Sequence, residues 1–227
     1  MQAPTTGEVK SPLRVVIADD HEIMRKGVRA LLEARGWSVV GEAADGRAAV
    51  TETKRLSPDV VVLDIAMPLL NGLDAAREIH KAAPATAVLV LTMYESEQMV
   101  RSVLAAGAKG YVLKSDAAQY LVAAVESLAS DRPFFSGRAS QILLDSYLTD
   151  TPTAVGEAKT PDTMLTSRER EILQLLAEGK SNKQVASLLD LAVKTVETHR
   201  SNIMRKLNLH SLSELIHYAV RNKLIDI

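Results

Sequence analysis

The chain contains no cysteine among its 227 residues. Disulfide bonds, thiol chemistry and cysteine-ligated zinc or iron–sulfur centres are therefore excluded. Long apolar segments are also missing, because runs such as residues 87–91 are far shorter than the roughly twenty residues of a membrane-spanning helix. Residues 1–12 hold no apolar block of the kind that a secretory signal contains. These absences lead us to expect a cytoplasmic protein with no membrane segment.

Aromatic residues are scarce, at 4% of the chain, but hydrophobic residues make up 47% and charged residues 24%, which is typical of a soluble globular protein. The length suits one large domain or two small ones. Charge is divided unevenly. Residues 1–165 hold 17 basic and 21 acidic residues, whereas residues 166–227 hold 10 and 7. Two domains with different partners would explain this division, and nucleic acid is a candidate partner for the basic one.

Short apolar runs alternate with helical patterns through the first part of the chain. The run Val60–Leu63 is continuous and β-branched, as expected for a strand buried on both faces. Strands that alternate with helices predict a flavodoxin-like, doubly wound five-stranded parallel α/β sheet with helices on both faces. The predicted strands are 13–18, 38–41, 60–63, 87–91 and 110–113. The predicted helices begin near 23 and end near 36, and then cover 46–56, 72–83, 95–106 and 116–130.

The rest of the chain has a different pattern. We expect a loose arm at 1–12, the α/β domain at 13–131 and a connecting region at 132–163, with a helix near 137–147 and a Thr- and Pro-rich linker from 149. From 164 to 227 the spacing of apolar residues is purely helical, which predicts a small all-α domain. Its expected helices are 167–178, 182–189, 193–207 and 211–222. Capping boxes begin the first two of them: Thr166 with Glu169, and Ser181 with Gln184.

Polar residues follow the predicted strands at the sheet edge where ligands bind in such folds. Asp19 and Asp20 follow the first strand, and Asp64 follows the third. Thr92 follows the fourth strand and Lys114 the fifth. Each residue alone is ordinary, since Asp often forms turns, Lys is usually solvated and Thr favours strands. Their coincidence at one edge predicts a site shared by three carboxylates, a hydroxyl and an ammonium group.

This set of groups suits phosphoryl transfer. Close carboxylates repel one another unless a cation joins them, and Mg²⁺ prefers one or two carboxylates, water and phosphate oxygens. Asp64 is the expected nucleophile toward phosphorus, while Asp19 and Asp20 would hold the metal. The neighbouring His21 is expected to pack in its loop or to cap a helix, and only less readily to bind metal. The groups that would contact the transferred phosphoryl group are Lys114 and Thr92.

Several motifs resemble those of the receiver domain of bacterial two-component response regulators, over about residues 13–130. The motifs are Asp19-Asp20, Asp64-Ile65-Ala66-Met67-Pro68 with Asn71-Gly72, Leu91-Thr92, and Gly110-Tyr111-Val112-Leu113-Lys114. The resemblance implies that Asp64 is the phosphoacceptor and that a sensor histidine kinase is the donor. It also implies a bound Mg²⁺, and its ligands would be Asp19, Asp20, Asp64 and the backbone carbonyl of Ala66.

The resemblance further implies a switch. Thr92 and Tyr111 would be the switch pair and Lys114 the phosphate clamp. Phosphorylation adds about −1.5 to −2 charges, so Thr92 would move toward the phosphoryl group and leave space into which the Tyr111 ring rotates. Without the resemblance, Tyr111 is better interpreted as a half-buried strand aromatic. Ser115 follows the clamp lysine where many receivers have proline.

Residues 182–207 predict a helix, a short turn and a second helix, which is the layout of a helix-turn-helix. On the second helix, the residues that recur at helical spacing and should face the core are Val196, His199 or Arg200, Ile203 and Leu207. The opposite side carries residues that can reach base edges or phosphates: Lys194, Glu197, Thr198, Ser201 and Arg205. The alternative is an ordinary solvated face, on which Glu197 merely pairs with a neighbouring cation.

The residues of this domain strongly resemble a LuxR-type DNA-binding domain, over about 162–227. The matching stretches are 165–173, 179–186 and 194–207. A receiver joined to such a domain is similar to the NarL/FixJ class of response regulators, which implies promoter binding, usually as a homodimer on a two-fold site. The implied groove-facing residues are Lys194, Glu197, Thr198 and Ser201. The implied backbone contacts are Asn182, Lys183, Thr195, Arg200, Arg205 and Lys206.

Two local features of the helical domain qualify this picture. Ala192 stands at a helix N-cap where relatives often have Ser, and Asp190 is a candidate substitute for the missing cap. The last helix carries the apolar residues Leu212, Leu215, Ile216, Ala219 and Val220. Most of this stripe is expected to be core, and its exposed part resembles the family's dimer-forming helix.

The main hypothesis is a transcription regulator, not an enzyme, that phosphorylation of Asp64 switches. No Gly-rich ATP loop is present in the sequence, so the phosphoryl group must come from another protein. The receiver could cover the recognition helix at rest, with the linker permitting release. One alternative is a Mg²⁺-dependent phosphohydrolase, which leaves the second domain without a role. Another is a phosphate sink or protein-docking module whose helical domain does not bind DNA.

Overall fold

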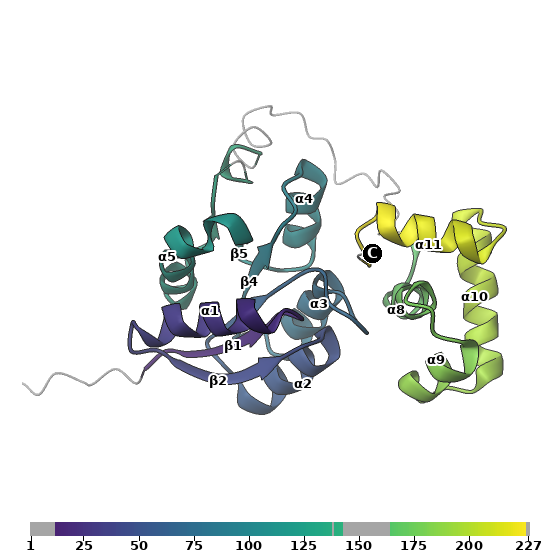
Figure 1. Cartoon of the computed structure of the whole chain (residues 1–227), viewed down its shortest axis with the longest axis horizontal. Helices are drawn as coiled ribbons and strands as arrows, with labels where there is room; N and C mark the ends of the chain where they lie inside the picture. Colours follow the sequence, from purple (N-terminus) through teal and green to yellow (C-terminus); the bar gives the residue numbers. More distant parts are fainter. Residues whose placement is uncertain (1–11, 138, 143–163, 226–227) are drawn as a thin grey trace, which may run out of the picture.

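The computed structural model of the chain describes residues 12–137, 139–142 and 164–225. These residues form an α/β domain followed by an all-helical domain (Figure 1). Most of the expected arm, the linker from 149 and residues 143–147 of the helix expected near 137–147 lie outside the described residues. The described part of that helix, 139–142, is helical.

The sheet of the first domain is parallel, with strand order β2-β1-β3-β4-β5-β6. Its strands are β1 (Arg14–Ala18), β2 (Ser38–Ala43), β3 (Val60–Leu63), β4 (Ala87–Thr92), β5 (Gly110–Leu113) and β6 (Phe134–Phe135). The sequence predicted five strands and missed β6. That strand has two residues, which is too short to produce a readable pattern. The central strand β3 is buried along its whole length, as its apolar run predicts.

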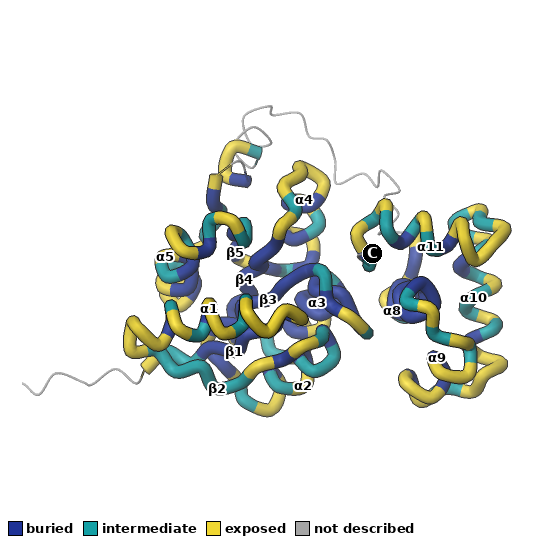
Figure 2. The backbone as a smooth tube through the Cα atoms, viewed as in Figure 1, coloured by how far each residue is buried: buried dark blue, intermediate teal, exposed yellow. Residues whose placement is uncertain are grey.

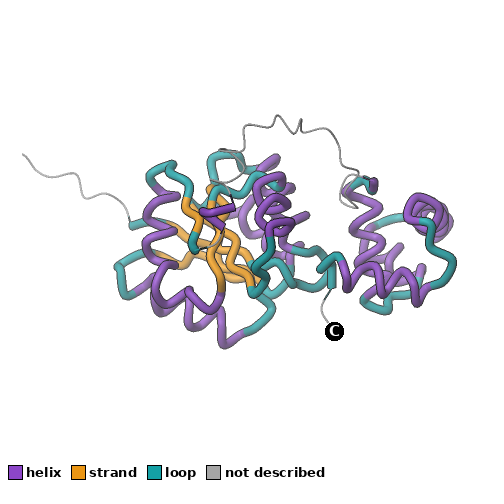
Figure 3. Tube along the Cα trace, turned by 90° about the horizontal axis from the view of Figure 1, so that it is seen from above, coloured by secondary structure: helices purple, strands orange, loops and turns teal. Residues whose placement is uncertain are grey.

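Helices cover both faces of the sheet, which Figure 3 shows from a second direction. One face packs against α1 (Glu22–Glu33) and α5 (Ala117–Ala129). The other packs against α2 (Gly46–Leu56), α3 (Gly72–Ala82) and α4 (Glu97–Ala105). A single 3-10 turn, Lys114–Asp116, links β5 to α5. The doubly wound fold predicted from the alternating pattern is confirmed.

The second domain consists of α8 (Ser167–Ala177), α9 (Asn182–Leu189), α10 (Val193–Leu207) and α11 (Leu212–Arg221) around one apolar core. Both predicted capping boxes are present, at Thr166 and Ser181. At the start of α10, Ala192 has no side-chain cap bond, and Asp190 is instead the left-handed C-cap of α9. The expectation that Asp190 replaces the cap is therefore wrong.

Helix α8 lies between the sheet domain and α10, and residues 169–177 are buried all round (Figure 2). One side of α8 packs in the core of the helical domain, and another side contacts the loop between β3 and α3. From that loop Leu69, with its backbone at φ +66, packs against the core of the helical domain. Among the described helices, none combines the length and apolar character needed to cross a membrane.

Candidate functional site

The carboxyl ends of the strands bring the predicted acidic residues together. Ligand atoms of Asp19, Asp20, His21 and Asp64 all lie within 4.8 Å of one another. Asp19 and Asp64 are buried, with 2% and 3% of their surface exposed. The Lys114 ammonium lies 2.8 Å from a carboxylate oxygen of each of these two residues. The predicted convergence of these groups at one sheet edge is confirmed.

Backbone contacts fix the position of Asp64. Its N–H donates to the Ala18 carbonyl at 2.8 Å, which continues the β1–β3 pairing by one residue. Its carboxylate accepts the N–H of Ile65, also at 2.8 Å. The start of α3 then presses against the Asp64 carbonyl, since a Cβ on Gly72 would lie 1.9 Å from that oxygen. Only glycine fits at this position, which explains part of the Asn71-Gly72 motif.

Burial dominates the electrostatics of the acidic site. It raises the pKa of Asp64 from 3.8 to about 6, against the opposing influence of Lys114. Burial alone would lower the pKa of Lys114, but the carboxylates of Asp64 and Asp19 outweigh it and raise that pKa. Lys114 is thus held as a cation between two carboxylates. A cation at this point is what the repulsion between the carboxylates requires.

Thr92 and Tyr111 are both buried, and Tyr94 connects them. The Thr92 hydroxyl accepts the Tyr94 N–H at 3.2 Å, and the Tyr111 hydroxyl donates to the Tyr94 carbonyl. The Tyr111 ring is only 1% exposed, so it already lies inward. The expected inward rotation of Tyr111 therefore does not describe this conformation. Sequence reasoning missed Tyr94 because a loop residue acting through its backbone leaves no side-chain signature.

His21 does not have the role expected of it. It occupies the N-cap of α1 without a side-chain cap bond, and its side chain is 70% exposed, so it neither caps nor packs. Its Nδ1 atom instead lies 2.7 Å from Asp20 and 3.4 Å from Asp19. The imidazole thus joins the exposed rim of the acidic site.

The second helix of the helix-turn-helix, α10, presents the predicted faces. Val196 and Ile203 are buried in the core. Exposed or partly exposed on the outer side are Lys194, Thr195, Glu197, Thr198, Arg200, Ser201 and Arg205. Glu197 accepts from the Lys194 ammonium at 3.1 Å, so the alternative of pairing with a neighbouring cation describes its state here.

Two further predicted contacts stand at the start of α9. Asn182 and Lys183 line a shallow hollow between α9 and α10, together with Glu197 and Arg200. The N–H groups at a helix start favour phosphate there. Lys206 does not join this surface, because its ammonium donates to Glu169 of α8 at 2.7 Å. In this structure its bond thus lies within the domain, and its role as a DNA contact stays a prediction.

Comparison with known families agrees with both halves of the structure. Residues 15–126 match the family described as the response regulator receiver domain, and residues 163–219 match the bacterial regulatory proteins of the luxR family. The chain belongs to the bacterial response regulators of the NarL/FixJ class, in which a receiver precedes a LuxR-type DNA-binding domain. Such a protein regulates transcription and is not an enzyme, which overturns the phosphohydrolase alternative.

Individual relatives cover nearly the whole chain. It is 38% identical over 216 residues to the oxygen regulatory protein NreC of Staphylococcus carnosus, which covers 94% of this chain and 100% of the relative. The response regulator RcsB of Salmonella typhimurium superposes with a TM-score of 0.56 at 28% identity, over 93% of this chain and all of that one. A solved RcsB–DNA complex gives a TM-score of 0.55 at 29% identity, over 92% and 98%.

Proposed function

We propose that Asp64 accepts a phosphoryl group from a partner sensor histidine kinase, and that this event switches promoter binding by the helical domain. The observation that carries the proposal is the placement of Asp64, buried at the end of β3 with the Lys114 ammonium 2.8 Å from its carboxylate. One carboxylate oxygen attacks phosphorus, so a P–O bond forms while the P–N bond to the kinase histidine breaks. Lys114 then holds the phosphoryl oxygens as a fixed positive charge.

The donor set fits Mg²⁺. The oxygens of Asp19, Asp20 and Asp64 are clustered, and hard oxygen ligands are what this ion prefers. The Ala66 carbonyl, two residues beyond Asp64, is the proposed fourth ligand. When bound, Mg²⁺ neutralises carboxylate charge and positions the phosphoryl oxygens for in-line transfer. Asp19, Asp20 and Asp64 would hold the metal, and the Lys114 ammonium supplies a further positive charge beside it.

Thr92 and Tyr111 are proposed to report the modification through Tyr94. The Thr92 hydroxyl would donate to a phosphoryl oxygen, and its movement toward that oxygen would break the bond in which it accepts the Tyr94 N–H. The freed Tyr94 segment stays tethered by the Tyr111 hydroxyl on its carbonyl. The switch proposed here is thus a shift of the β4–α4 loop around an inward Tyr111, and this replaces the expected rotation of its ring.

The helical domain is proposed to bind promoter DNA as a homodimer in the cytoplasm once Asp64 is phosphorylated. Base edges would be reached from α10 and phosphates from both α10 and α9. The proposed groove-facing residues are Lys194, Glu197, Thr198 and Ser201. The proposed backbone contacts are Asn182, Lys183, Thr195, Arg200, Arg205 and Lys206. The exposed Leu212 at the start of α11 is the candidate for contact with a second copy.

The test is affinity selection of genomic DNA fragments, with and without a small-molecule phosphodonor and Mg²⁺. Wild type, Asp64→Asn and the control Asp131→Asn are compared, because Asp131 is 84% exposed and far from the site. We expect a few two-fold symmetric fragments to be enriched only with donor, and Asp64→Asn alone to lose this effect. Equal enrichment in every sample would exclude phosphorylation as the control. No enrichment in any sample would favour the docking-module alternative.

A further inference from the structure

The receiver and the helical domain are joined by buried polar contacts from the β3–α3 loop. At the centre is Gln174 of α8, whose side chain has no exposed surface. Its amide nitrogen donates to the Met67 carbonyl at 2.9 Å, and its amide oxygen accepts the Asn71 N–H at 2.7 Å. Beside it, Glu178 accepts the Leu69 N–H at 3.0 Å. Alternate residues of one loop thus bond to two side chains of the other domain.

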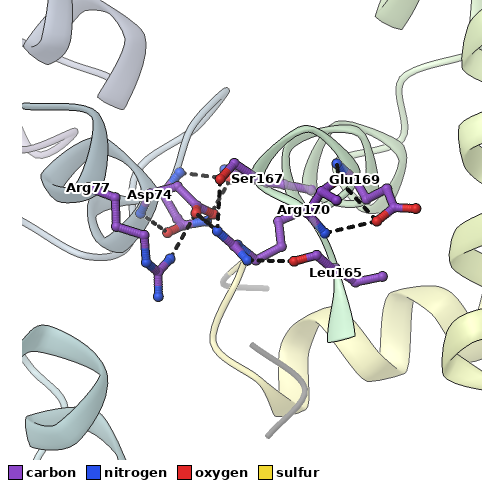
Figure 4. Close-up of polar contacts among 9 residues, drawn as sticks. Asp74, Arg77, Leu165, Ser167, Glu169 and Arg170 are labelled. Carbon is purple, nitrogen blue, oxygen red and sulfur yellow. Dashed lines mark hydrogen bonds and ion pairs between the residues drawn. The ribbon is translucent and has the colours of Figure 1, made fainter. Parts of the chain in front are cut away.

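A buried ion pair flanks these bonds (Figure 4). The Arg170 guanidinium donates through two nitrogens to one carboxylate oxygen of Asp74, each at 2.8 Å, and both side chains are more than nine-tenths buried. Arg77 donates to the same oxygen from within α3. We call this set the loop–α8 contact; its members are Met67, Leu69, Asn71 and Asp74 of the receiver and Arg170, Gln174 and Glu178.

The loop in this contact is held rigidly on the receiver side as well. The start of α3 is pressed against the Asp64 carbonyl at Gly72, and the start of α2 against the Leu70 carbonyl at Gly46, where an added Cβ would lie 1.9 Å away. The Met67 and Gly72 N–H groups both donate to the Ile65 carbonyl. A displacement at one end of this loop therefore reaches the other end, because the segment has little freedom to absorb it.

We infer that the loop–α8 contact, in addition to the β4–α4 loop, couples the state of Asp64 to the helical domain, and that Gln174 is the central residue of this contact. The inference rests on the proposed function. The proposed metal ligand, the Ala66 carbonyl, and the Gln174 acceptor, the Met67 carbonyl, belong to successive peptide units. A pull on the first moves the second, and a buried amide that loses its partners is costly. Phosphorylation with bound metal thus favours release of α8.

The contact acts by holding the helical domain in one orientation. Helix α10 lies on the far side of α8 from the receiver, and the side chain of Lys194 at its start is 88% exposed (Figure 1). The expectation that the receiver covers the recognition helix is therefore wrong for this structure. Two helical domains that bind a two-fold DNA site must be spaced like its half-sites, which lie about one turn of DNA apart. Release of each helical domain from its receiver permits that spacing.

Thermodynamic linkage makes the coupling reciprocal. If metal and phosphoryl binding at Asp64 weaken the loop–α8 contact, then loss of that contact strengthens metal binding by the same factor. A variant that breaks the contact should therefore bind Mg²⁺ more tightly although the change lies in the other domain. A purely structural role for Gln174 would leave Mg²⁺ affinity unmoved.

The experiment measures amide hydrogen exchange of the full chain, because the Leu69 and Asn71 N–H groups report the contact directly. The Gly72 N–H, bonded to Ile65 at 2.8 Å within the receiver, is the internal reference. With phosphodonor and Mg²⁺, we expect the Leu69 and Asn71 amides of the wild type to exchange about tenfold faster, with Gly72 unchanged. Phosphoryl uptake is verified separately on a phosphate-affinity gel.

Gln174→Ala and Glu178→Ala are then compared with Gln119→Ala, an exposed glutamine of α5. Without donor, we expect both α8 variants to show the fast exchange, with Mg²⁺ and DNA affinities raised about five-fold or more. The Gln119 control should match the wild type. The two α8 variants guard against one of them failing to fold.

Two outcomes would overturn the inference. One is a phosphorylated wild type whose Leu69 and Asn71 amides remain as protected as before. The other is α8 variants with wild-type affinities for Mg²⁺ and DNA. Absence of phosphoryl uptake by the wild type would instead contradict the proposed function. Raised DNA affinity of the α8 variants in that case would show that the proposed function had failed and the loop–α8 contact had not.

Discussion

The Lys114 ammonium lies 2.8 Å from a carboxylate oxygen of Asp64 and at the same distance from one of Asp19. One lysine thus bridges the proposed phosphoacceptor and a proposed metal ligand. Even so, burial keeps the pKa of Asp64 raised, at about 6. The buried, ionised carboxylates therefore lower the stability of the fold, and the proposed Mg²⁺ would offset that loss.

The first prediction concerns Asp64 and stability without metal. The pKa of Asp64 is raised in the folded state, so its contribution to stability is present below about 3.8 and lost as pH rises through about 6. In chelator at pH 7, Asp64→Asn should raise the free energy of unfolding by roughly 2 kcal/mol, and the gain should vanish toward pH 4. Urea titrations across this range measure it.

Asp131→Asn is the control for this series, because the exposed Asp131 has its pKa lowered by Lys109. That variant should show no gain at pH 7. A gain for Asp64→Asn that does not change with pH would argue against the raised pKa of Asp64.

The second prediction concerns Gly72. A Cβ there would lie 1.9 Å from the Asp64 carbonyl oxygen, so Gly72→Ala must displace the start of α3 or the end of β3. We expect a loss of about 3 kcal/mol in the free energy of unfolding. Gly27→Ala in α1 is the matched control, since nothing lies within 4 Å of its added Cβ. It should stabilise by about 0.5–1 kcal/mol, and similar effects of both changes would contradict the close packing at Gly72.

The third prediction concerns the salt dependence of DNA binding. Lys194 and Arg205 are exposed on α10, whereas Lys206 is bound to Glu169. Each phosphate contact contributes about 0.9 to the slope of log affinity against log salt. Lys194→Ala with Arg205→Ala should weaken DNA binding and lower the slope by roughly 1, because Arg205 is the proposed phosphate contact of the two. Lys206→Ala should destabilise the domain, because it removes the bond to Glu169. A lower slope in that variant would support Lys206 as a phosphate contact, and an unchanged slope would exclude it.

The fourth prediction concerns the phenol of Tyr111. Burial and the negative charge of Glu95 raise its pKa to about 12, and its hydroxyl donates to the Tyr94 carbonyl. An ultraviolet titration of Tyr111→Phe should lack the phenol that ionises last, and the variant should lose about 1 kcal/mol of stability. Tyr120→Phe, whose ring packs at a tilt against Phe134, should keep that last transition. Loss of the last transition in Tyr120→Phe would show that the raised pKa does not belong to Tyr111.

Local signals in the sequence were sufficient for most of the helices and for the acidic site. The capping boxes at Thr166 and Ser181 depend on residues three apart, and both are present in the structure. The convergence of Asp19, Asp64 and Lys114 follows from topology alone, because parallel strands end at one edge.

Features that depend on contacts between distant segments were not predictable. The polar residues of α8, such as Gln174, would be expected on a solvated face, yet the receiver buries them. Tyr94 was missed and the role of His21 was wrongly predicted for a similar reason, since what each contacts depends on the folded loop around it. Periodicity describes one helix or strand at a time and carries no information about what another domain places beside it.

Leu69 has a consequence for how regulators of this kind exchange parts. Its backbone is left-handed, and its half-buried side chain packs against the core of the helical domain. A chimera that joined this receiver to an unrelated helical domain would leave that leucine exposed, and the reverse chimera would remove the loop partners of Gln174. The boundary across which modules can be recombined therefore does not coincide with the linker. A workable exchange must carry the β3–α3 loop and α8 together, as one inherited unit.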